Sequence, residues 1–162
     1  MDHLWAPWRS EYIEDLHVTR KKRSEHLFFD IGQSADDEDN LVFFRSKSCY
    51  AILNRFPYNS GHCMVIPYRE LAELKDLSTN EKTDLWETVD KVTDALKQAY
   101  KPHGFNIGIN MGVGTGAGFP HHLHVHIVPR WKEDANFLTT TAETRIHPKE
   151  LSTIYQDLKK NI

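Results

Sequence analysis

Residues 122–128 read His-Leu-His-Val-His-Ile-Val, which sets three histidines in strict alternation with apolar side chains. Side chains along a β-strand point alternately to the two faces of a sheet, so this pattern predicts a strand with His122, His124 and His126 on one face. The apolar residues between them form the opposite face, which we expect to pack against a helix. Three titratable rings on one face bring no packing benefit, and we therefore interpret them as functional.

Two kinds of chemistry suit such a histidine face. Imidazole is a common metal ligand, but His122 and His126 would lie roughly 13 Å apart in a strand, and no carboxylate or thiol stands beside the strand to complete a metal site. A neutral imidazole is also a good nucleophile at phosphorus, provided that an acceptor holds its second nitrogen. We favour phosphoryl chemistry and keep a metal-dependent hydrolase as the alternative.

A glycine-rich turn comes just before the histidines: Gly112-Val113-Gly114-Thr115-Gly116-Ala117-Gly118. The backbone N–H groups of such a turn can cradle an anion, and they stabilise developing negative charge without many lysines. A glycine-rich turn on its own more often has only a structural role. Beside the histidines, however, Gly116 and Gly118 become candidates for phosphate binding.

The rest of the chain predicts an α+β fold. Apolar, aromatic and β-branched residues indicate further strands, at 41–44, 48–53, 62–67 and 105–110. Because these strands cluster around a single long helix, we expect a mainly antiparallel sheet of about five strands.

The long helix is marked at both ends. Ser78 and Glu81 form a capping-box signature, and the helix is expected to end near Tyr100, before Pro102 and Gly104. Its apolar stripe consists of Leu85, Val89, Val92 and Leu96, widened by Trp86 and Tyr100. Shorter helices are expected at 70–77 and, near the C-terminus, at 148–158.

Composition limits the function classes. With 162 residues the chain suits one domain, and its net charge of -3 argues against binding to a nucleic-acid backbone. No apolar run approaches the roughly 18 residues of a membrane span, and the N-terminus lacks the shape of a signal peptide. The two cysteines exclude a disulfide scaffold and a four-cysteine zinc site. We therefore expect a soluble, cytoplasmic protein without nucleic-acid or membrane partners.

The stretch 122–128 resembles the motif of the histidine triad (HIT) family, His-φ-His-φ-His-φ-φ with φ apolar, at every position. The segment 54–62, Asn-Arg-Phe-Pro-Tyr-Asn-Ser-Gly-His, is similar to the loop and strand entry of the family's nucleotide site. The segments 4–13, 116–120 and 129–131 are similar to a bacterial branch that includes diadenosine tetraphosphate phosphorylases.

The resemblance implies a fold, an assembly and a reaction. It implies one HIT-like domain over residues 1–162, with 1–26 as an N-terminal extension, and a homodimer in which two sheets join into one. The implied reaction is hydrolysis or transfer at the α-phosphate of a nucleotide through a nucleotidyl-histidine intermediate, with no cofactor required. A phosphoramidate or adenylate hydrolase and a non-catalytic nucleotide-binding module remain alternatives, and the choice between phosphorolysis and hydrolysis stays open.

The resemblance also assigns catalytic roles. His124 would be the nucleophile, and the backbone carbonyl of His122 would orient its ring. His126 and His62 would contact the phosphate oxygens.

Substrate-binding roles follow in the same way. Asn54 matches a ribose-binding position, Asn110 matches a polar position near the phosphate, and Phe28, Ile31 and Leu53 correspond to base-pocket positions. From composition alone, however, Asn54 is equally a turn residue and the three apolar residues are equally ordinary core.

One feature departs from the family pattern. Many relatives carry Cys-x-x-Cys before the first strand and bind a structural zinc ion with the help of two histidines. Here the matching stretch begins His26-Leu27-Phe28-Phe29, and a later ligand position is occupied by Glu70. We therefore doubt a structural zinc and expect apolar packing by Phe29 in its place.

Overall fold

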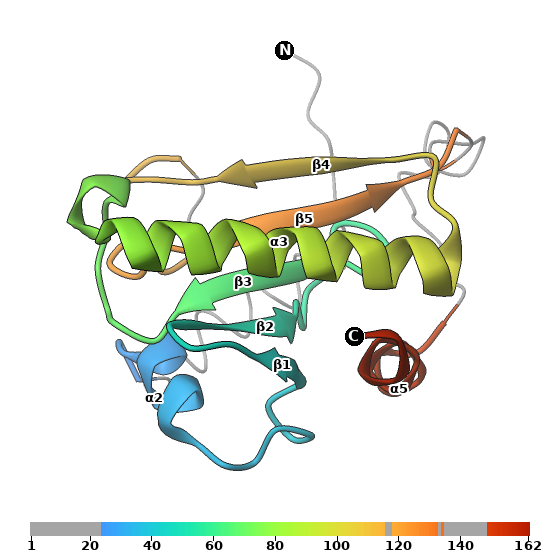
Figure 1. Ribbon diagram of the computed structural model, residues 1–162, viewed down its shortest axis with the longest axis horizontal. Helices are drawn as coiled ribbons and strands as arrows, with labels where there is room; N and C mark the ends of the chain where they lie inside the picture. The colour runs from blue at the N-terminus through green and yellow to red at the C-terminus, as the bar shows by residue number, and fades with distance from the viewer. Residues whose placement is uncertain (1–23, 116–117, 133, 135–148) are drawn as a thin grey trace.

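The computed structural model describes residues 24–115, 118–132, 134 and 149–162. In this part of the chain five strands form one antiparallel sheet in the order β1-β2-β3-β5-β4, and the long helix α3 lies across one face of it (Figure 1). The strands are β1 (Val42–Arg45), β2 (Cys49–Leu53), β3 (Cys63–Pro67), β4 (Gly104–Ile109) and β5 (Val125–Arg130). The predicted α+β class is confirmed.

Helix α3 spans Thr79–Tyr100 and begins as predicted. The Ser78 side chain accepts a hydrogen bond from the backbone N–H of Glu81, whose carboxylate accepts one from the N–H of Ser78 in return. The four predicted stripe residues are buried against the sheet. Trp86 is not part of that buried stripe, because the residue is 47% exposed.

Each face of the sheet carries its own buried cluster. The cluster beneath α3 also includes apolar residues of α5 (Leu151–Asn161), the C-terminal helix. The cluster on the opposite face includes Ile52, Met64 and Phe28, the last contributed by the short helix α2 (Leu27–Gln33). This second face is the one that carries the histidines, because His126 pairs with Met64 across β5 and β3.

The histidine strand starts later than predicted. The hydrogen-bonded strand begins at Val125, because the N–H of His122 donates to the carbonyl of Phe119 in a turn and that of Leu123 donates to the carbonyl of Leu71. The predicted alternation nevertheless continues back to residue 122, since Leu123 belongs to the cluster beneath α3.

The same strand also ends later than predicted, because Pro129 lies inside β5. β3 pairs with β5 only as far as Ile127. On that side of β5, no neighbouring strand therefore needs a hydrogen bond from the backbone nitrogen of Pro129, which has no hydrogen to donate. The carbonyl of Pro129 instead accepts a hydrogen bond from Asn59 at 3.0 Å. Proline is tolerated at such a position of a sheet.

The helix predicted over 70–77 is a single 3-10 turn, η1 (Leu74–Asp76). The carbonyl of Leu71 is bonded to Leu123, which removes it from any helical ladder. The predicted Gly116, Pro148 and most of the extension 1–26 lie outside the described residues. No helix of the described part is long and apolar enough to cross a membrane.

Candidate active site

A pocket opens on the face of the sheet opposite α3. Its cavity volume is ≈ 300 Å³, and one end is bordered by His124 and His126. The other side chains are mainly apolar, and the rings of Phe28 and Phe119 meet there with centroids 4.8 Å apart. The apolar lining consists of Leu27, Phe28, Ile31, Leu41, Ile52, Leu53, Phe56, Met64 and Phe119.

The ring of His124 is held in one tautomer. Its Nδ1 lies 2.8 Å from the backbone carbonyl oxygen of His122, and because a carbonyl oxygen only accepts, Nδ1 carries the proton and donates it. Nε2 is therefore the nitrogen with the free lone pair. Burial lowers the pKa of His124 below its ordinary value, so the ring is neutral at pH 7. A neutral imidazole with a free Nε2 can act as a nucleophile.

A chain of hydrogen bonds fixes the tautomer of His126. The backbone N–H of Tyr58 donates to Nδ1 of His62 at 3.0 Å, so the proton of His62 resides on Nε2. That N–H donates to Nδ1 of His126 at 2.9 Å, which leaves the proton of His126 on Nε2. The site therefore places a lone pair on Nε2 of His124 beside a ring N–H donor on His126. The centroids of these two rings are 4.8 Å apart.

His62 is separated from the pocket by burial and by hydrogen bonds. Its side chain is fully buried, it does not line the pocket, and both of its ring nitrogens are bonded to neighbours. The structure thus places His62 behind His126, as seen from the pocket, and its predicted contact with a phosphate stays a prediction. Burial, together with His126 and His124, lowers the pKa of His62 to about 3, and burial lowers that of His126 to about 4.

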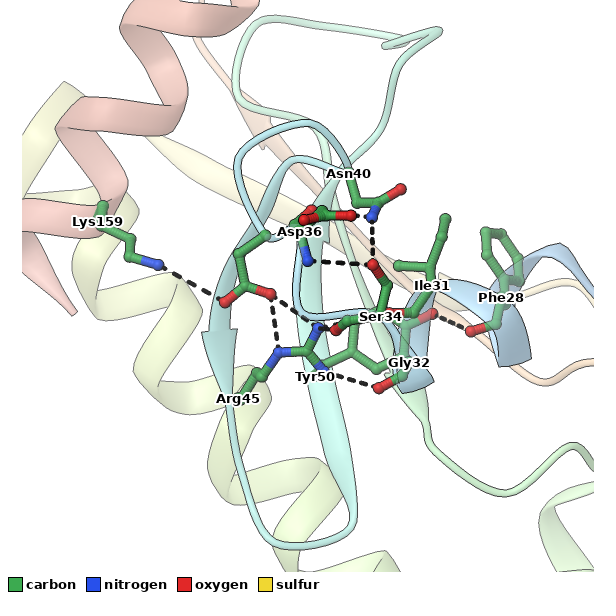
Figure 2. Close-up of polar contacts among 10 residues, drawn as sticks. Phe28, Ile31, Gly32, Ser34, Asp36, Asn40, Arg45, Tyr50 and Lys159 are labelled. Carbon is green, nitrogen blue, oxygen red and sulfur yellow. Dashed lines mark hydrogen bonds and ion pairs between the residues drawn. The ribbon is translucent and has the colours of Figure 1, made fainter.

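Arg45 is hydrogen-bonded to the C-terminal end of helix α2 (Figure 2). Its guanidinium donates to the carbonyl oxygens of Gly32 at 2.9 Å and Ser34 at 2.7 Å, at the end of α2. It also donates to the carboxylate of Asp37 at 2.9 Å. The hydroxyl of Tyr50 donates to the Phe28 carbonyl at 2.6 Å. These bonds fix the helix that supplies one wall of the pocket.

The model of the HIT domain family matches residues 35–133, well over half of the chain. The chain belongs to the HIT family. It is 41% identical over 155 residues to an AP-4-A phosphorylase of Mycobacterium tuberculosis, covering 93% of this chain and 79% of that protein. It is 38% identical over 120 residues to an asymmetrical bis(5'-nucleosyl)-tetraphosphatase of Schizosaccharomyces pombe, covering 74% of this chain and 58% of that protein.

Solved structures agree on the fold of this HIT protein. A zinc-bound histidine triad family protein from Mycobacterium smegmatis superposes with a TM-score of 0.67 at 23% identity, covering 83% of this chain and 91% of that one. A diadenosine triphosphate hydrolase from Plasmodium falciparum superposes with a TM-score of 0.62 at 19% identity, covering 94% and 92%.

Several of the predicted binding residues meet at the pocket. Phe28, Ile31, Asn54 and Gly118 line it, and Leu53 borders it while its side chain packs in the cluster beneath α3. Asn110, which follows β4, does not line the pocket. The roles of all these residues in binding substrate stay predictions.

Sequence reasoning missed part of the pocket. For Ile52 and Met64 the signal was available, because alternation along two neighbouring strands places them on the face of His126. Asn40 and Phe119 also line the pocket. Both lie in connecting segments, where no periodicity indicates which side chains meet.

The region compared with the zinc site of relatives is held by an ion pair. Nδ1 of His26 lies 2.7 Å from a carboxylate oxygen of Glu70, and this hydrogen bond raises the pKa of His26. Phe29 does not replace the metal by packing, because it is 40% exposed. Among the described residues no three His, Cys, Asp or Glu side chains are grouped to hold a metal ion. His26 and Glu70 alone do not form a set of ligands that fits a zinc ion. That the protein lacks a structural zinc ion stays a prediction.

Acid should destabilise the protein through His62. Above pH 6.5 His62 is neutral in both the folded and the unfolded chain. Below pH 6.5, His62 binds a proton in the unfolded chain, whereas in the folded chain it stays neutral until about pH 3. The free energy of unfolding should therefore fall between these values, by up to about 1.4 kcal/mol per pH unit from this residue. Urea unfolding at pH 7, 5.5 and 4.5 measures this, and His62→Gln should flatten the slope. An equal slope in both proteins contradicts the assignment.

Arg45→Met should loosen α2. Losing the bonds to its carbonyl groups is expected to lower the free energy of unfolding by roughly 1–3 kcal/mol and to raise KM several-fold with little change in kcat. Denaturant unfolding and steady-state kinetics measure both quantities. Arg69→Met is the control, because it removes an exposed ion pair with Glu81 and one hydrogen bond to the carbonyl of Asp76, away from α2. Equal effects of the two variants would refute the anchoring role.

Proposed function

We propose that this HIT protein cleaves dinucleoside polyphosphates such as diadenosine tetraphosphate, or related nucleotides, at the α-phosphate through a nucleotidyl-histidine intermediate. The observation that carries the proposal is the free Nε2 of His124 at the end of an apolar pocket, next to the N–H donor of His126. The two named relatives, a phosphorylase and a tetraphosphatase for such compounds, support the substrate class.

The reaction runs in two displacements. Nε2 of His124 attacks the α-phosphorus, and an N–P bond forms while the P–O bond to the leaving phosphate chain breaks with its electron pair. His126 donates its Nε2–H to a phosphoryl oxygen, where negative charge develops. Water or inorganic phosphate then attacks the phosphorus, the N–P bond breaks with return of its electron pair to Nε2 of His124, and the proton of the attacking oxygen is released to solvent.

The pocket holds one nucleoside. Its ≈ 300 Å³ lies at the lower end of the roughly 300–1,000 Å³ typical of small-molecule sites. The base would lie on Phe28 and Ile31, and the ribose near Asn54. The second nucleoside of the substrate would then extend away from the pocket with the leaving group.

A substrate panel run with and without inorganic phosphate tests the proposal. ADP formed from diadenosine tetraphosphate only in the presence of phosphate indicates phosphorolysis, whereas AMP and ATP formed without phosphate indicate hydrolysis. If only nucleoside phosphoramidates are cleaved, the protein is a phosphoramidate hydrolase and does not act on dinucleoside polyphosphates. Absence of any cleavage across the panel would overturn the enzymatic function.

We further propose that the protein is a homodimer joined through β4. Among the described residues this strand ends the sheet, and it exposes 44% of Ile107 on the face that α3 covers, while Trp86 of α3 is 47% exposed. A strand edge left unpaired by the described residues, together with exposed apolar side chains on the strand and on α3, favours pairing with a second chain. Ile107→Asp should give monomers in sedimentation equilibrium, whereas a monomeric unmodified protein would contradict the dimer.

A cytoplasmic location belongs to the same proposal. Cys49 and Cys63 are both free and buried, as is usual in a reducing compartment.

A further inference from the structure

Asn40 lines the pocket with an amide whose orientation is fixed. Its Nδ2 donates to the backbone carbonyl of Asp36 at 2.9 Å and to the hydroxyl of Ser34 at 3.2 Å. Because the carbonyl of Asp36 can only accept, the amide nitrogen must face it. Figure 2 shows the amide oxygen pointing away from both partners. Turning the amide over would set two oxygens against each other.

The amide oxygen of Asn40 is left as an acceptor. Among the described residues it has no hydrogen-bond donor, although Asn40 borders the cavity together with Phe28 and Ile31. The comparable oxygen of Asn54 is already occupied, because it accepts the N–H of Phe56 at 2.9 Å. Asn40 therefore carries an acceptor of fixed orientation on a residue that lines a mainly apolar pocket.

We propose that Asn40 selects the nucleobase by accepting a hydrogen bond from an exocyclic amino group, as adenine carries at C6. This inference rests on the proposed function, and it assigns a specificity to the same site. A base with a carbonyl group in that place would present an oxygen to the Asn40 oxygen. Such a base loses the hydrogen bond and meets electrostatic repulsion instead, so amino-bearing bases are preferred.

Nucleotide binding tests this without requiring turnover. AMP, purine riboside 5′-monophosphate, which lacks only the amino group, and IMP are titrated into the full chain by calorimetry. One net hydrogen bond predicts that AMP binds about fivefold more tightly than the analogue without the amino group, and IMP should bind no better than that analogue. In Asn40→Leu the preference for AMP should disappear.

Two controls separate recognition from structure. Asn80→Leu makes the same change at an exposed position of α3 and should keep the preference. Loss of the Asn40 bonds to Ser34 and Asp36 can weaken the binding of all three nucleotides, so the ratio of their Kd values is the readout. Thermal unfolding confirms that the variant is folded.

The outcomes are distinct. Equal Kd values for the three nucleotides in the unmodified protein, or an AMP preference that survives in Asn40→Leu, overturn the role of Asn40 and leave the proposed function standing. Failure of the unmodified protein to bind any of the three overturns both. A preference for AMP that only Asn40→Leu abolishes supports the inference.

Discussion

Replacing His124 by alanine should lower the turnover of diadenosine tetraphosphate by at least about 10³-fold, because the variant has no nucleophile to form the covalent intermediate. AMP binding should change little, since the pocket is built mainly from apolar side chains of α2, β2 and β3. Steady-state kinetics gives turnover and calorimetry gives binding. Denaturation during turnover of a substrate labelled in the α-phosphate should trap label on the unmodified protein and none on the variant.

His121→Ala is the matched control, because this neighbouring histidine is exposed and has no part in the proposed reaction. It should keep nearly full turnover. Normal turnover in His124→Ala, or label trapped on that variant, would remove His124 from the mechanism.

The second large effect is expected at His62, which does not line the pocket. His62→Leu removes the N–H that bonds Nδ1 of His126, so His126 is free to carry its proton on the wrong nitrogen. Removing one donor to a developing charge commonly costs about 10²–10³-fold in kcat, and we expect about 10²-fold here. His62→Gln can still offer an N–H toward His126 and should recover most of the activity.

Three measurements distinguish this positioning role from a general loss of structure. Both variants should unfold cooperatively, kcat should fall far more than KM rises, and the Gln variant should exceed the Leu variant in kcat by at least about tenfold. Equal activity of the two variants would show that the N–H of His62 does not matter.

Periodicity was sufficient for most elements of the fold. The alternation at 122–128 identified the faces of the histidine stretch, and the capping box fixed the start of α3. Strand limits were predicted less well, because they depend on the partner available to each backbone group. Residues 122 and 123 bond to a turn and to Leu71, and Pro129 remains in β5 because β3 reaches no further along β5 than Ile127.

The same division holds for the site. The sequence alone identified the face that carries the histidines, because their alternation does not depend on what packs against it, and the match to the HIT motif predicted His124 as the nucleophile. Only the tertiary structure decided the tautomer of each ring. The tautomer of a ring depends on hydrogen-bond partners that are distant along the chain. For His126, the partner is His62, whose own tautomer is set by the N–H of Tyr58. The pocket wall likewise arises where α2 and two connecting segments meet the sheet, which no local pattern encodes.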